Sequence, residues 1–89
     1  MDRNRDLRRR AIELVDQELG RLRAFGPETL GQLCARSPID DTREGITITT
    51  RVAPEGERLM VLVEAWRGRR VLATSGFAMD PDGTARTPD

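Results

Sequence analysis

The chain has 89 residues and a formal net charge of zero at pH 7. This length fits one domain, so we take residues 1–89 as a single small unit. One cysteine and no histidine exclude an intramolecular disulfide and a tetrahedral zinc site of the usual kind within one chain. Nucleic-acid-binding domains are commonly strongly basic, and a pI of about 6.3 therefore weakens a global electrostatic case for that class.

All fifteen basic residues are arginine, and the chain contains no lysine and no tyrosine. An arginine-only basic set with many alanines and glycines is typical of a GC-rich bacterial genome. No apolar run approaches the roughly 20 residues that span a bilayer. Residues 1–10 also lack the apolar segment of a secretory signal. We therefore expect a soluble, cytoplasmic bacterial protein.

The first third of the chain predicts two helices, a long one over residues 3–25 and a short one over 27–36. Gly26-Pro27 separates them, since proline suits a first helical turn. Cys34 lies on the apolar face of the short helix and, without a histidine to activate it, is expected to be a core thiol. The apolar positions of the long helix recur at helical spacing: Leu7, Ala11, Leu14, Val15, Leu19 and Leu22, with Ile12 and Phe25 at the margin.

The remainder predicts an antiparallel sheet over about residues 46–87. Residues 37–45 are expected to form the longest loop, and from Ile46 the apolar period changes to two. We expect strands over 46–53, 58–66 and 70–79, with a short fourth edge strand after the turn at 80–84. The predicted fold is therefore α+β with the order ααβββ, in which both helices pack on one face of a three-stranded meander.

The two faces of this sheet can be assigned if both hairpin loops hold an even number of residues. The helix-packed face would then carry Ile46, Ile48, Thr50, Val52, Leu59, Val61, Val63, Ala65, Leu72, Thr74 and Ala78. The outer face would carry Thr47, Thr49 and Arg51 on the first strand, and on the next two Met60, Leu62, Trp66, Val71, Ala73, Phe77 and Met79. Only Glu64, Arg69 and Ser75 would interrupt this second apolar surface.

An apolar outer face has no partner within the predicted fold, and monomers rarely expose large contiguous patches. A second copy is the commonest cover, because two-fold homo-oligomers dominate. We therefore expect a non-catalytic protein that acts by protein–protein association, with self-association as a homodimer favoured over an unidentified protein partner. The predicted interface residues are Met60, Leu62, Trp66, Val71, Phe77 and Met79.

The stretch Trp66-Arg67-Gly68-Arg69-Arg70 supports an alternative reading, a nucleic-acid-binding module. An aromatic ring beside arginines can stack on bases, although the same stretch is typical of a tight hairpin turn with glycine at a positive-φ position. The N-terminal arginines form a second basic cluster. The candidate anion or nucleic-acid contacts are Arg8, Arg9, Arg67, Arg69 and Arg70.

Other chemistry has little support in the sequence. Glu64, mid-strand among apolar residues, is expected to pair with Arg69 or with an arginine across a dimer interface, rather than to serve as a catalytic acid. Asp40, Asp41 and Glu44 could bind a hard cation, but turn chemistry is the commoner use of such residues. No catalytic motif, cofactor site or metal site is predicted. Because the chain has no histidine, lysine or tyrosine, carboxylates are the main side chains left that could act as general bases.

Overall fold

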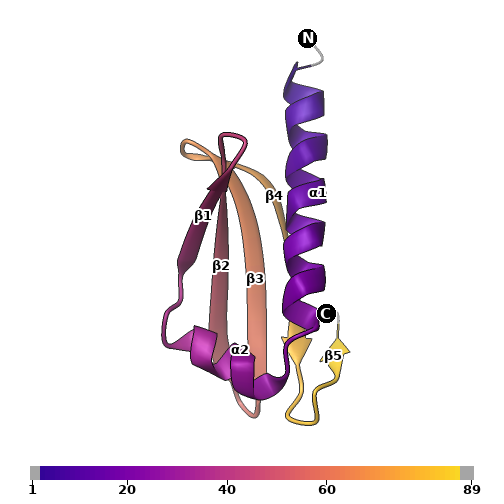
Figure 1. The fold of residues 1–89 in the computed structure, drawn as a ribbon, viewed down its shortest axis with the longest axis vertical. Helices are drawn as coiled ribbons and strands as arrows, with labels where there is room; N and C mark the ends of the chain where they lie inside the picture. Colours follow the sequence, from indigo (N-terminus) through magenta and orange to yellow (C-terminus); the bar gives the residue numbers. More distant parts are fainter. Residues whose placement is uncertain (1–2, 87–89) are drawn as a thin grey trace.

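The computed structural model describes residues 3–86, which form two helices and one five-stranded antiparallel sheet with the strand order β1-β2-β3-β4-β5 (Figure 1). The expected α+β class is confirmed, and a short strand at residues 85–86 follows the turn at 80–84 as expected. The sheet holds more strands than the three of the predicted meander, because a further strand precedes them. The elements are α1 (Arg3–Arg23), α2 (Pro27–Cys34), β1 (Ile39–Arg43), β2 (Ile46–Glu55), β3 (Arg58–Arg67), β4 (Arg70–Met79) and β5 (Ala85–Arg86).

Both helices cover the same face of the sheet. Helix α1 runs along β4 and β3, and α2 crosses β2 and β3 near the end of the sheet that lies opposite the β1–β2 and β3–β4 turns (Figure 1). The N-terminal half of α1 lies beside those two turns. In the part of the chain that the structure describes, neither helix combines the length and the apolar character needed to cross a membrane.

The apolar stripe of α1 forms the centre of the core. Ala11, Leu14, Leu19 and Leu22 are each at most 3% exposed and pack against the inner face of the sheet. Helix α1 ends at Arg23, two residues before the predicted limit, because the backbone turns ahead of the Gly26-Pro27 break. Burial of this stripe, at about 25 cal/mol per Å² of apolar surface, is the main stabilising contribution of the helix.

Strand β1 was predicted as loop, and this prediction is wrong. Its sequence carries a single apolar residue, Ile39, followed by Asp40, Asp41, Thr42 and Arg43, so no period-two hydrophobic signal is present. The strand lies at the edge of the sheet, where only one side is paired and the exposed residues can be polar. Its place in the sheet comes from hydrogen bonding to β2, which the side-chain pattern does not report.

The pairing of β2 with β3 follows the even-loop register that the sequence predicts. Ile48 lies opposite Ala65, and Val52 lies opposite Val61, and all four side chains are at most 3% exposed on the helix-packed face. Gly56, with φ of +63°, opens the two-residue turn between these strands.

A β-bulge between β3 and β4 exchanges the two faces of most of β4. Trp66 pairs with Val71, but Ala65 pairs with Ala73, so Leu72 is an additional residue in β4. Beyond the bulge, the odd-numbered side chains of β4 turn toward the helices. A one-residue shift has this effect because neighbouring side chains along a strand point to opposite faces.

The bulge overturns the predicted faces of β4. Phe77 and Met79, predicted on the outer face, are 0% and 1% exposed in the core, and Ala73 also packs against the core. Thr74 and Ala78, predicted on the inner face, lie on the outer side in register with Glu64 and Met60. The β3–β4 turn itself has two residues, as the even-loop assumption requires. The extra residue, Leu72, lies within β4.

Candidate functional site

The outer face of the sheet, turned away from both helices, keeps part of its predicted apolar surface. Trp66 and Val71 are cross-strand neighbours close to the β3–β4 turn, and Leu62 lies between Arg51 and Gly76. These side chains share one face because β2 and β3 alternate regularly and the bulge lies after the Trp66–Val71 pair.

We call Met60, Leu62, Trp66 and Val71 the outer patch. Leu62 and Val71 are 39% and 45% exposed, which makes them two of the three most exposed large hydrophobic side chains among residues 3–86. Met60 and Trp66 are half-buried. The patch therefore contains four of the six predicted interface residues, whereas Phe77 and Met79 are core residues and cannot contribute to an outer contact.

Glu64 and Arg51 form an ion pair within the outer face. The Arg51 Nε donates to Glu64 Oε1 at 2.9 Å, and the glutamate side chain is 17% exposed against 50% for the arginine. The sequence predicted an arginine partner for Glu64, either Arg69 or an arginine across a dimer interface, and Arg69 lies in the β3–β4 turn. The observed partner comes from β2, where Arg51 is diagonal to Glu64 across the strand pair.

A cavity of about 920 Å³ lies where the first turns of α1 meet the β3–β4 turn. Its lining brings together the two basic clusters that are more than fifty residues apart in the chain. We call it the arginine pocket, and its five arginines are Arg3, Arg5 and Arg8 of α1, Arg67 of β3 and Arg70 of β4. Asp6, Leu7 and Leu72 complete the lining.

One ion pair and one close approach lie next to the arginine pocket. Arg10 of α1 donates from Nε to Glu44 Oε2 at 2.8 Å, which ties the helix to the β1–β2 turn. Hydrogen bonding to Glu44, reinforced by Glu13, raises the pKa of Arg10 above its ordinary value. Arg67 lies next to the same turn, since a Cβ placed on Gly45 would be 4.0 Å from its Nη1.

The candidate residues of the Trp66–Arg70 stretch do not all lie on the same face of the β3–β4 hairpin. Gly68, with φ of +59°, and Arg69 form the turn, and Arg67 pairs with Arg70. Trp66 precedes Arg67 in the strand and points to the opposite face, so the tryptophan ring does not line the arginine pocket. Of the five predicted anion contacts, Arg8, Arg67 and Arg70 line the pocket, whereas Arg9 and Arg69 are exposed outside it.

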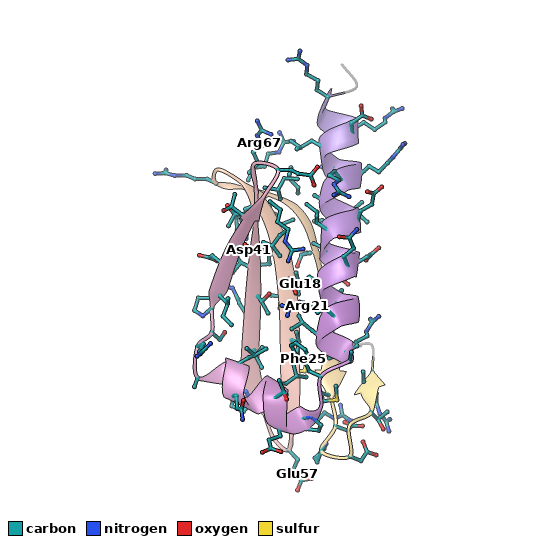
Figure 2. All side chains as sticks on the ribbon, viewed as in Figure 1. Glu18, Arg21, Phe25, Asp41, Glu57 and Arg67 are labelled. Atoms are coloured by element: carbon teal, nitrogen blue, oxygen red, sulfur yellow. The ribbon has the colours of Figure 1, made fainter. Side chains whose placement is uncertain are left out.

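The opposite end of the sheet is acidic. A shallower depression of about 660 Å³ is lined by Glu55, Glu57, Asp80 and Asp82, with Arg58 as its arginine. Figure 2 shows Arg67 and Glu57 at opposite ends of the molecule. A chain with zero formal net charge thus has one basic and one acidic end.

The acidic residues near β1 each have a separate partner. Asp40 accepts a hydrogen bond from Thr49 Oγ1 at 2.8 Å, Asp41 accepts one from Arg43 at 2.8 Å, and Glu44 binds Arg10. Within residues 3–86, no three acidic, histidine or cysteine residues are grouped so as to hold a metal ion. Cys34, expected as a core thiol, packs against the core but is only half-buried.

Glu18 is a buried charged residue that the sequence analysis did not single out. It is 4% exposed and accepts from Arg21 Nε at 2.5 Å and from Arg43 Nη2 at 3.3 Å. Figure 2 places Glu18 and Arg21 on α1. Arg43 binds Glu18 from β1. The available signal was its position within the apolar stripe, four residues after Leu14 and four before Leu22.

Comparison with known proteins does not assign the chain to a family. No protein-family model matches it, and neither the curated proteins nor the solved structures include a significant match. Any functional assignment therefore rests on the residues and contacts described above.

Proposed function

We propose that this protein acts by self-association, as a non-catalytic homodimer whose two copies meet through the outer faces of their sheets. The observation that carries the proposal is the outer patch of Met60, Leu62, Trp66 and Val71, which no helix covers. Tryptophan, methionine and arginine are enriched in interface cores, and this face combines all three types. Covering exposed apolar side chains would add hydrophobic stabilisation to a small domain.

The Arg51–Glu64 pair favours a second copy of this chain as the partner. In a two-fold contact the same surface meets itself, so Arg51 of one copy can approach Glu64 of the other. A face that carries both charges is therefore complementary to itself. The Glu64 side chain, at 17% exposure, already lies in a partly desolvated position where an additional arginine would be favourable.

The edge of the sheet is a weaker candidate for self-association. The β1 edge carries Asp40 and Asp41, both exposed. Antiparallel pairing of two β1 strands would bring these carboxylates close to their counterparts in the other copy, and charged side chains on an edge strand oppose such pairing.

The test is the solution mass measured by light scattering after size exclusion, for the wild type and for Leu62→Glu. We expect a dimer that persists at high salt, because apolar contacts are not screened, and a monomer for Leu62→Glu. Ile12→Glu is the matched control, since Ile12 is 48% exposed on α1, away from the outer face, and should leave the dimer intact. A monomeric wild type, or equal effects of the two variants, would refute the proposal.

A further inference from the structure

We propose that the arginine pocket binds a compact polyphosphate ligand of the nucleoside triphosphate class. The pocket lies within one chain and does not depend on the self-association proposed above. Its volume of about 920 Å³ is in the range of small-molecule sites, roughly 300–1,000 Å³. Its walls come from α1, β3 and β4, and the neighbouring Arg10–Glu44 contact ties α1 to the β1–β2 turn.

Within the described residues 3–86, the arginines of the pocket differ from most other arginines in that no ion pair joins them to a carboxylate. Arg10, Arg21, Arg43, Arg51, Arg58 and Arg86 each form an ion pair with an aspartate or glutamate. Among residues 3–86, none of the five pocket arginines forms such a pair with a described carboxylate. Five arginine side chains therefore line one cavity, and among the described residues Asp6 is the only acidic residue in its lining.

Like charges gathered in one cavity repel one another, and a bound anion of several charges relieves this repulsion. Guanidinium groups match phosphate oxygens with paired hydrogen bonds, which makes arginine the residue of choice for phosphate recognition. A ligand with two or three linked phosphates could contact arginines from α1 and from the β3–β4 turn together. The chemistry of the lining thus selects for clustered negative charge.

Leu7 and Leu72 give the pocket an apolar portion that inorganic phosphate would leave unused. Leu7 is half-buried on α1, and Leu72 is the extra residue of the β-bulge, half-buried against the core. The planar base of a nucleotide can cover such side chains while its phosphates contact the arginines. We therefore expect a nucleoside triphosphate to bind more tightly than a phosphate chain of equal length.

The geometry favours a small ligand over a nucleic-acid strand. Single-stranded nucleic acids are usually held on grooves in which aromatic rings stack on successive bases. Among the described residues, no aromatic side chain lines this pocket, and Trp66 lies on the opposite face of the hairpin. The acidic depression at the far end of the sheet would also repel a strand that extended along the molecule.

The proposal is tested by calorimetric titration with ATP at low salt in the presence of a chelator, so that no divalent ion neutralises the phosphates. The informative variant is Arg8→Gln/Arg70→Gln, and the matched control is Arg9→Gln/Arg69→Gln. Both remove one arginine from α1 and one from the β3–β4 hairpin, and all four side chains are exposed. We expect the first to weaken ATP binding by about tenfold or more and the control by less than about threefold.

Four results would overturn the proposal. The first is no binding of ATP to the wild type, and the second is equal weakening of ATP binding by both double variants, which would indicate non-specific attraction. Stronger binding of a single-stranded oligonucleotide than of ATP would favour the nucleic-acid reading. Equal affinity for tripolyphosphate and ATP would remove the role of Leu7 and Leu72 and with it the nucleoside class. Far-UV circular dichroism checks that both variants fold.

Discussion

Phe77 of β4 lies directly opposite Val61 of β3, and both side chains point into the core beneath α1. The guanidinium of Arg23, at the end of α1, lies 5.5 Å from the centre of the Phe77 ring. The largest buried side chain of the sheet thus contacts the helix layer, two residues before the end of β4. This pairing exists because the bulge at Ala65/Trp66 has exchanged the faces of β4.

We expect Phe77→Ala to destabilise the protein by about 3–5 kcal/mol, since it leaves a cavity where a ring was fully buried. Leu62→Ala on the exposed outer face should cost far less in the same urea titration at a concentration where the protein is monomeric. If Phe77→Ala fails to fold, Phe77→Leu provides a milder variant. Similar losses for Phe77→Leu and Leu62→Ala would contradict the exchanged faces.

The buried glutamate of α1 gives a second prediction. Glu18→Gln keeps the shape of the side chain but removes the charge that Arg21 and Arg43 contact, and we expect a loss of about 1–2 kcal/mol in the free energy of unfolding. The estimate is modest because both arginines are more than a third exposed. Glu13→Gln, at a carboxylate that is 51% exposed, is the control and should cost less. Equal losses of unfolding free energy in the two variants would show that the buried position of Glu18 does not strengthen its ion pairs.

Gly76 and Gly20 are predicted to respond to alanine with opposite signs. A Cβ on Gly76 would collide with the backbone carbonyl oxygen of Val61 on β3, so we expect Gly76→Ala to destabilise the sheet by about 1–3 kcal/mol. Gly20 lies inside α1 with open space around it, and Gly20→Ala should stabilise the protein by about 0.5–1 kcal/mol. Thermal unfolding of the two variants measures both effects. A neutral or stabilising Gly76→Ala would mean that β3 and β4 lie farther apart than described.

The turn before β5 gives a prediction for acidic pH. The backbone N–H of Thr84 donates to Asp82 Oδ1 at 2.9 Å, and this hydrogen bond lowers the pKa of Asp82 below its ordinary value of 3.8. A carboxyl whose pKa is lower in the folded state stabilises the fold above its unfolded pKa. This contribution is lost as pH falls through the folded pKa.

Carbon-detected NMR titration of the Asp82 carboxyl should therefore give a pKa below 3.8 in the folded protein. Asp82→Asn should slightly reduce the change of the free energy of unfolding with pH below pH 3.8. An Asp82 pKa at or above 3.8 would contradict the hydrogen bond from Thr84.

Much of the fold can be read from local patterns. The helical spacing of Leu7, Leu14 and Leu22 reports which face of α1 is buried, because side chains four residues apart share a face. The alternation from Ile46 onward likewise reports the inner faces of β2 and β3. These features depend on neighbours in the sequence, and the structure agrees with them.

Features that depend on pairing between distant segments could not be read in this way. Strand β1 has no apolar alternation, because an edge strand is defined by hydrogen bonds to β2 rather than by side-chain burial. The partner of Glu64 within the chain is Arg51 rather than Arg69, because strand register, not distance along the chain, brings Arg51 beside it.

The candidate sites show the same division. The sequence by itself determined that Arg8 and Arg70 belong to basic clusters and that Leu62 and Trp66 lie on one side of a strand. The tertiary structure decided that Arg8 and Arg70 line one cavity, because packing of α1 along β4 brings the helix start to the β3–β4 turn. It also decided that Phe77 belongs to the core, because one extra residue in a strand reverses every side chain that follows.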